Sequence, residues 1–338
     1  MKLKINKKKT ALLLFGFIAL CTMSLLYIIN FKKNDSRKND NDTEQLAHVI
    51  LYDKIQTLQS INKNSKNIYA SPAMKIEHTY DYVYSYAYEP YVISEKYIAE
   101  VFKELHLKKV LENKSPPYRM ILGTNENREE VRIGIDENTL TYTKDSVYSN
   151  KSFSPNAVES DYNRYINDPI LVKLKIPINR YTFDKSSYYD FSSPEPIAVK
   201  HLVNATTIKF SYIAKHKDIP IVDKKLNITQ NKLDIYVNSN NEIIKIDINF
   251  VGNVKQQLDK YKIKNVNDVI NDINNGKAKF ITSTASPGDD ILYTNVYKGY
   301  ISYYAIDSKL LPFYVLVGNS GTSYNKVNKS YVFLDATK

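Results

Sequence analysis

The strongest pattern along the chain is a run of uncharged, mostly apolar residues near its start, from Ala11 to Phe31. As a helix that rises about 1.5 Å per residue, the run would span about 31 Å, the thickness of a bilayer's hydrocarbon core. Lysines lie on both sides of it, as is typical of a membrane-spanning segment. The pattern predicts a basic cytoplasmic tail over residues 1–10, a transmembrane helix over 11–31 and a polar tether over 32–43.

A processed N-terminus is the alternative interpretation of this run. Ala19 and Cys21 weakly resemble a signal-peptide cleavage site and a lipoprotein cysteine. However, the apolar run continues for ten residues beyond Cys21, and the bulky Leu20 stands where a lipoprotein signal needs a small residue. We therefore expect a single-pass membrane protein with a cytoplasmic N-terminus and with the 307 residues after Phe31 outside the cell membrane.

Alternating tyrosines mark the first folded part of the chain. Strict spacing at every second position predicts a strand. The residues in question are Tyr80, Tyr82, Tyr84, Tyr86 and Tyr88. A helix is predicted near residues 44–60, Ser94 is placed to cap another, and strands follow near 118–122, 131–135 and 139–143. These elements predict a first module over residues 44–150 and a linker over 151–165.

A second module is predicted over residues 166–338. Asn265 is placed to cap a helix whose apolar stripe includes Val269 and Ile270, and Gly276 follows its end. Strands are predicted near residues 207–214, 233–237, 243–250, 291–297, 301–305, 312–317 and 331–334. Runs of antiparallel strands with isolated helices indicate an α+β fold. The expectation is therefore an N-terminal transmembrane helix followed by two antiparallel-sheet-plus-helix modules.

The net charge of the chain comes mostly from its first 38 residues. The net charge is +11, but nine basic side chains and one acidic side chain lie in the first 38 residues. The other 300 residues carry 38 basic and 35 acidic groups, so the folded part is nearly balanced. Because a nucleic-acid-binding face needs clustered basic groups on the folded domain, we expect no nucleic-acid partner.

The sequence offers no familiar catalytic or metal-binding motif. The five histidines are too far apart for zinc-binding spacing, and the single cysteine, Cys21, lies in the apolar run. The residues around Pro287 and Asp289 lack the spacing of a calcium loop. We therefore expect no catalytic, cofactor-binding or metal-binding residues, although a hydrolase with two carboxylates distant in sequence stays open.

The order of elements in the second module resembles a known family type. The segments that carry the resemblance are Ile208–Asp223, Lys232–Phe250, Val266–Ala278, Asn295–Gly318 and Tyr331–Ala336. Together they resemble the PepSY-type modules and the related YycI-like extracytoplasmic modules of membrane-anchored bacterial regulators. The resemblance covers about residues 205–338, and more faintly 94–145. It implies a regulatory or inhibitory binding module without an active site of its own.

Tyrosine is the unusual component, because 28 of the 29 tyrosines lie outside the apolar run. One interpretation makes Tyr80–Tyr88 an aromatic face that binds glycan or peptide. The other packs this face against the module's helix as core and leaves the side with Asp81, Ser85 and Glu89 in solvent. The leading functional hypothesis is a non-enzymatic sensor or regulator whose partners are the membrane and another envelope protein. The alternative is a protein that binds cell-wall glycan, or has a structural role at the surface, through tyrosine-rich faces.

Overall fold

The structure is a computed structural model. It describes residues 67–338 with the exception of 78, 145–150, 154–161, 193–195, 223–231, 284–290, 307 and 323–326. The described residues belong to one compact unit, Gln56–Lys338. The predicted tail, transmembrane helix, tether and helix near 44–60 lie outside them. Within the described part of the chain, no helix is both long and apolar enough to cross a membrane.

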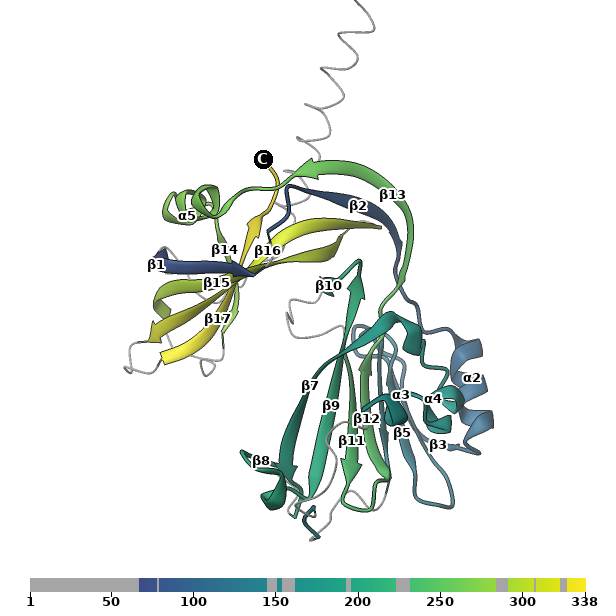
Figure 1. Ribbon diagram of the computed structural model, residues 1–338. Coiled ribbons are helices and arrows are strands. Elements are labelled where there is room, and N and C mark those ends of the chain that lie inside the picture. Colours follow the sequence, from purple (N-terminus) through teal and green to yellow (C-terminus); the bar gives the residue numbers. More distant parts are fainter. Residues whose placement is uncertain are drawn as a thin grey trace, which may run out of the picture. The chain divides into compact units, whose positions relative to one another are not determined.

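Strands dominate the described residues (Figure 1). Its seventeen strands are β1 (Ile68–Glu77), β2 (Tyr82–Glu89), β3 (Lys108–Asn113), β4 (Met120–Thr124), β5 (Glu130–Gly134), β6 (Thr139–Thr143), β7 (Tyr181–Asp190), β8 (Ile197–Val199), β9 (Thr207–His216), β10 (Ile219–Val222), β11 (Lys232–Asn238), β12 (Ile243–Asn249), β13 (Asn253–Lys262), β14 (Lys279–Ser283), β15 (Ile291–Ile306), β16 (Lys309–Thr322) and β17 (Val327–Asp335). The helices are α2 (Glu95–Glu104), α3 (Tyr162–Ile166), α4 (Pro169–Lys173), α5 (Val266–Asn274) and the 3-10 turns η3 (Ile178–Arg180) and η4 (Leu202–Asn204).

Nine of these strands form an antiparallel sheet in the order β8, β7, β9, β11, β12, β6, β5, β4, β3. One face is apolar, and α2, α3 and α4 cover it (Figure 1). Tyr165 of α3 stacks on Phe210 of β9 at 5.2 Å between ring centroids. Tyr97 of α2 donates a hydrogen bond to the carbonyl of Leu174 at 2.8 Å. The helices therefore protect one side of this sheet, and the opposite side carries mostly polar residues.

The long hairpin of β15 and β16 organises the remaining strands. Near its open end, β15 pairs with β1 in parallel, and β16 pairs with β17, which in turn pairs with β14. Near its closed end, β15 pairs with β10 in parallel, and β16 pairs with β2, which in turn pairs with β13. Because β10 also pairs with β9, all seventeen described strands belong to one hydrogen-bonded network.

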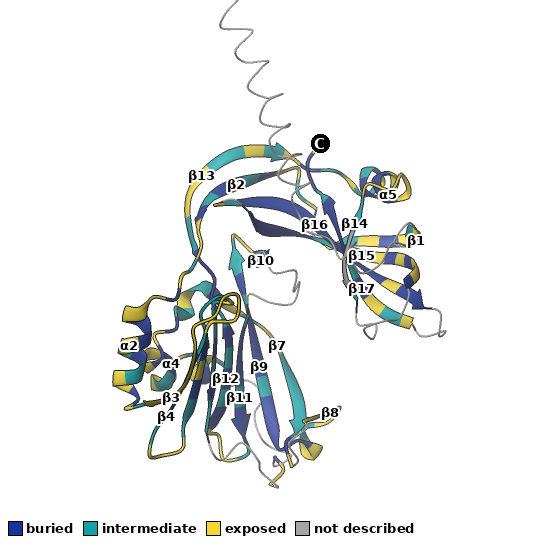
Figure 2. Cartoon of the chain, turned by 180° about the vertical axis from the view of Figure 1, so that it is seen from behind, coloured by how far each residue is buried: buried dark blue, intermediate teal, exposed yellow. Residues whose placement is uncertain are grey.

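The helix α5 packs beside β1, and its buried side chains are Val269, Asp272 and Ile273. Ile270, predicted near the centre of the stripe, is only partly buried. Figure 2 shows that α5 has both buried and exposed positions, whereas β16 is buried over most of its length. The predicted cap is confirmed: Asn265 accepts from the amide of Asp268, and the Asp268 carboxylate accepts from the amide of Asn265.

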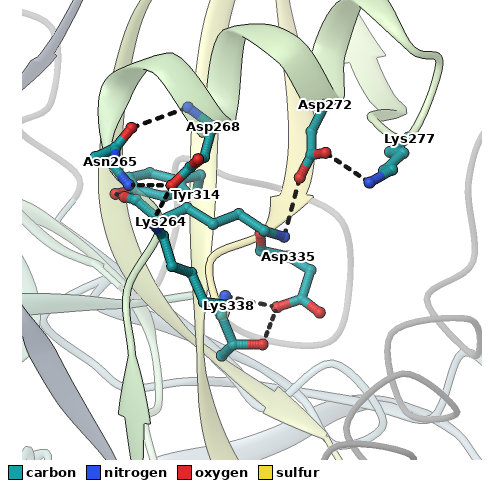
Figure 3. A network of polar contacts seen from close by, with 9 residues as sticks. Lys264, Asn265, Asp268, Asp272, Lys277, Tyr314, Asp335 and Lys338 are labelled. Carbon is teal, nitrogen blue, oxygen red and sulfur yellow. Dashed lines mark hydrogen bonds and ion pairs between the residues drawn. The ribbon is translucent and has the colours of Figure 1, made fainter.

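Figure 3 shows the polar contacts that fix α5 to the sheet. The buried carboxylate of Asp272 forms ion pairs with the ammonium groups of Lys277, at 2.7 Å, and Lys264, at 3.2 Å. Burial by itself would raise the pKa of Asp272, but the two ammonium groups outweigh it and hold that pKa below its usual value. Lys264 also donates to the carbonyl of Asp335, and Tyr314 donates to the carbonyl of Lys264.

The predicted α+β fold with two sheet-plus-helix modules is wrong. The described part is a large, mixed, mainly β structure, in which the α-helices have five to ten residues. Strands on the two sides of residues 151–165 pair directly, β6 with β12 and β2 with β13. Alternation of apolar residues identifies a strand and its buried face, but it does not specify which distant strand becomes its neighbour. The two predicted modules therefore exchange strands, so they are not separate units of the fold.

Several individual elements are confirmed. Ser94 caps α2 by accepting a hydrogen bond from the amide of Tyr97. The strands predicted near residues 207–214, 233–237 and 243–250 correspond to β9, β11 and β12. The two strands predicted near 291–297 and 301–305 are one continuous strand, β15, with bulges along it.

Candidate functional site

A cavity of about 570 Å³ lies on the polar side of the nine-stranded sheet. Its apolar lining comes from Pro220, Ile221 and Val222 of β10, together with Ile213 of β9 and Ile301 of β15. Apart from Ala214 and Ser211, the rest of the lining is charged or aromatic. The cavity is therefore built where β10 connects the nine-stranded sheet to the hairpin of β15 and β16.

Strand register places the polar lining in rows across β9 and β11. Lys209 lies opposite Tyr236, Ser211 opposite Asp234, and Ile213 opposite Lys232. Since side chains alternate between the two faces of a strand, these residues share the side that the helices leave uncovered. The apolar residues between them face the core, which fixes the direction of the polar ones.

The carboxylate of Asp234, whose side chain is only 2% exposed, contacts several residues of the cavity lining. Its carboxylate accepts the hydroxyl of Ser211 at 2.6 Å and the ammonium of Lys232 at 2.8 Å, and Lys209 lies at 4.0 Å. A buried carboxylate needs such partners, because its desolvation would otherwise cost several kcal/mol. Asp234 therefore holds two lysines of the cavity lining in place without lining the cavity itself.

The opposite wall is acidic and aromatic. Tyr300 is partly buried, and burial, followed by its neighbours Tyr331, Glu77 and Asp184, raises the pKa of its hydroxyl above the usual value. Burial and the nearby Asp218 likewise raise the pKa of Tyr80. Both tyrosines therefore stay protonated and can donate hydrogen bonds over the physiological pH range.

The strand β10 is fixed on both sides. The hydroxyl of Ser302 on β15 donates to the carbonyl of Pro220 at 2.8 Å. Lys217 and Asp218, which make the turn between β9 and β10, both have positive φ values of 49° and 65°. His216 ends β9 with its ring edge-on to Tyr86 at 4.3 Å, and burial and the nearby Lys217 lower its pKa. These contacts hold the cavity wall against the strand β2.

The five tyrosines singled out by their spacing do not form one face. Tyr80 lines the cavity, and Tyr82 is 49% exposed with the Lys260 ammonium 4.1 Å from its ring centroid. Tyr84 is partly buried, with Lys260 and Lys217 each 6.0 Å from its ring centroid. Tyr86 and Tyr88 are buried. The burial changes along the strand because β2 pairs with β16 at one end and follows β13 over its length.

The other side of β2 is also buried at its centre. Val83 and Ser85 are almost fully buried, whereas the sequence favoured solvent on this side. Ser85 accepts from the amide of Asp259 on β13 at 3.1 Å. Tyr88 accepts from the amide of Gly252 at 2.7 Å, and a side chain at Gly252 would collide with the backbone of Glu89. The central part of β2 therefore has a structural role on both faces.

Charges of both signs surround the cavity in similar numbers. The charged groups that line it are Glu77, Asp184, Lys185, Lys209, Lys215, Asp218 and Lys232. Among the described residues, no group of three or more histidine, cysteine or acidic side chains is placed to hold a metal ion. The arrangement can bind a ligand that carries both charges and hydrogen-bonding groups, because ammonium, carboxylate and phenol groups converge on it.

Apart from Tyr80, sequence reasoning did not identify these cavity residues. Lys209, Lys232 and Asp234 lie in strands that were predicted, but their polar positions were not assigned a function. The available signal was the alternation of Lys232, Asp234 and Tyr236 inside a strand that is otherwise apolar. A buried carboxylate between lysines on neighbouring central strands is rare enough to merit a functional hypothesis.

Comparisons with known proteins give a fold but no function. No family model matches the chain, and no curated protein matches it either. The chain is similar in structure to an uncharacterised protein from Eubacterium rectale ATCC 33656, whose crystal structure has been solved. The TM-score is 0.50 at 12% sequence identity, over 81% of this chain and 90% of that one. At this identity, the similarity concerns the fold alone.

Proposed function

We propose that this protein is a non-enzymatic binding protein of the cell envelope, which senses or regulates by taking a segment of a partner protein into its cavity. The observation that carries the proposal is the balanced set of ammonium, carboxylate and phenol groups around the cavity, two of whose lysines are held by Asp234. A polypeptide segment presents both charges together with backbone donors and acceptors, so it can satisfy all three kinds of group.

The envelope location rests on the sequence. The uncharged run of residues 11–31, with lysines on both sides, supports a membrane location with the folded part outside. The resemblance of residues 205–338 to PepSY-type and YycI-like modules of membrane-anchored regulators agrees with a role in regulation. The nearly balanced charge of the last 300 residues also suits a protein partner better than a nucleic acid.

Site-specific photocrosslinking of the full chain in native membranes tests this proposal. A benzophenone side chain replaces Lys215, which lines the cavity, and in a control it replaces Val172, which is 65% exposed on α4. We expect one protein adduct, identified by mass spectrometry, from position 215 and not from position 172. The adduct should fall about fivefold when Lys185→Glu reverses a charge at the cavity.

A matched charge reversal separates the cavity from the general surface. Lys96 lies on α2, with its side chain 87% exposed, and Lys96→Glu should leave the adduct unchanged. Equal adducts from positions 215 and 172, or an adduct that is insensitive to Lys185→Glu, would refute binding in the cavity. A failure of crosslinking at position 215 in membranes that contain the folded protein would have the same meaning.

A further inference from the structure

A second surface, separate from the cavity lining, exposes tyrosines on the strands β1 and β15. Tyr69, Tyr293 and Tyr297 are 53%, 48% and 38% exposed. Their neighbours Asn295 on β15 and Asn319 on β16 are also exposed. We call these five residues the tyrosine platform. Exposed aromatic groups gathered on one face indicate a binding surface more often than isolated ones do.

The strand register brings the platform together from three strands. Tyr69 lies beside Asn295 in the parallel pairing of β1 with β15, and Asn295 lies opposite Asn319 in the pairing of β15 with β16. Along β15, the exposed positions Tyr293, Asn295 and Tyr297 alternate with the buried positions 294 and 296. The five residues are therefore exposed on the same face of three adjacent strands.

The platform rests on a rigid support. On the buried side of the same strands, the hydroxyl of Ser320 is 2.5 Å from that of Thr294 on β15 and 2.5 Å from that of Ser330 on β17. On the exposed side, the ring of Tyr293 lies over Gly321 of β16, where a Cβ atom would collide with the ring. The absence of a side chain at Gly321 lets this ring lie close to the sheet, and close packing restricts its rotation.

From this arrangement we propose that the tyrosine platform binds a polysaccharide built of uncharged pyranose units. The flat face of a pyranose ring carries C–H groups that pack on an exposed aromatic ring, and its edge carries hydroxyl groups. Tyrosine offers a rigid apolar face at low entropic cost, and the amides of Asn295 and Asn319 can both donate to and accept from hydroxyls.

The charge of the platform favours a neutral sugar over other occupants. Its five residues are tyrosines and asparagines, and none of them is an acidic or a basic residue. Lys329 of β17, which lies opposite Asn319, has its ammonium 5.2 Å from the ring centroid of Tyr331. A nucleic acid or an acidic glycan would gain little from such a surface, because these ligands depend on clustered cations. Neutral rings and amides match a ligand that has hydroxyls and no charge.

Calorimetric titration of the full chain in detergent micelles tests the proposal, with cellotetraose and the uncharged tetra-N-acetylchitotetraose as the two probes. We expect at least one probe to bind, and Tyr293→Ala to weaken its binding about fivefold to tenfold. Tyr293→Phe keeps the ring and should stay within about twofold of the unchanged protein, since ring stacking contributes most of the effect. Asn319→Ala should weaken binding about threefold to tenfold through a lost hydrogen bond.

Tyr118 provides the matched control. It is 70% exposed and lies outside the platform, so Tyr118→Ala should leave sugar binding unchanged. No heat of binding from either probe at about 10 mM would overturn the proposal, as would binding that survives both Tyr293→Ala and Asn319→Ala. Sedimentation identifies the competing occupant: a self-association that Tyr293→Ala abolishes, without sugar binding, would assign the platform to a second copy of this chain.

Discussion

Truncation of Ile273 on α5 gives a quantitative test of how this helix is held. The side chain is fully buried, and the same helix buries Val269, so the two residues form the apolar contact with the sheet. Ile273→Ala removes three carbon atoms and leaves a cavity, because the capping box and the ion pairs of Asp272 keep the helix in place. The expected loss in the free energy of unfolding is about 2–5 kcal/mol.

Three further variants turn this value into a graded series. Ile273→Val should cost about 0.5–1.5 kcal/mol, because it removes a single methylene. Ile270→Ala should cost less than Ile273→Ala, since Ile270 is only partly buried. Asn271 is exposed on the same helix, and Asn271→Ala should remain within about 0.5 kcal/mol of the unchanged protein.

Urea denaturation followed by tyrosine fluorescence measures the series, and no tryptophan is present to mask the signal. The slope of the unfolding free energy against urea should be the same in all variants, with the midpoint alone shifting. Equal midpoints for Ile273→Ala and Asn271→Ala would refute the packing of α5 described above. A changed slope would mean that the variant alters the unfolded or native ensemble. The smaller change Ile273→Val would then be compared with the unchanged protein in place of Ile273→Ala.

Three other predictions follow from the site and the strand β2. Asp234→Asn keeps a hydrogen-bond acceptor for Ser211 but removes the negative charge between two lysines, so the free energy of unfolding in urea should fall by about 1–3 kcal/mol. A decrease below about 0.3 kcal/mol would contradict the role of Asp234. The pKa of His216 is lowered in the folded state, so the unfolded chain binds more protons when the pH is below the ordinary value of 6.5. Stability should therefore fall as the pH drops below 6.5. Denaturation series at several pH values should show a smaller fall for His216→Gln. Gly252→Ala brings a methyl group against the backbone of Glu89 and should cost about 1–3 kcal/mol in the same assay, whereas an unchanged midpoint would contradict the close approach of β2 and β13.

Local features of the fold were predictable, because they depend on neighbouring residues. Ser94 and Asn265 cap helices through side chains that reach amides three residues away, and the strands β9, β11 and β12 have clear apolar alternation. Short-range chemistry of this kind leaves its pattern in the sequence.

Other strands had no such signal. The strand β1 contains Pro72 and a shift of register between Ala70 and Lys75, and β13 has two shifts of register and many exposed polar residues. Irregular pairing interrupts the two-residue period on which strand prediction depends. These strands are held by their neighbours, so their conformation follows from tertiary contacts.

The cavity was beyond sequence reasoning for a related reason. Its residues come from parts of the chain as far apart as Glu77, Lys185 and Tyr331. Each is an ordinary polar or aromatic residue in its own strand, and only the pairing of β10 with both β9 and β15 brings them together. The tyrosine platform likewise joins Tyr69 to residues near the end of the chain.

The strands β1 and β2 pair with strands that lie much later in the chain, and this separation affects how the newly made protein folds. Both strands leave the ribosome early, but their partners β13, β15 and β16 follow roughly 160 to 230 residues later. At synthesis rates of about 5–20 residues per second, about 8–46 s pass before these partner strands are made. Contacts of such long range also slow folding after synthesis. During that interval the edges of both strands lack their final partners, and unpaired strand edges favour aggregation.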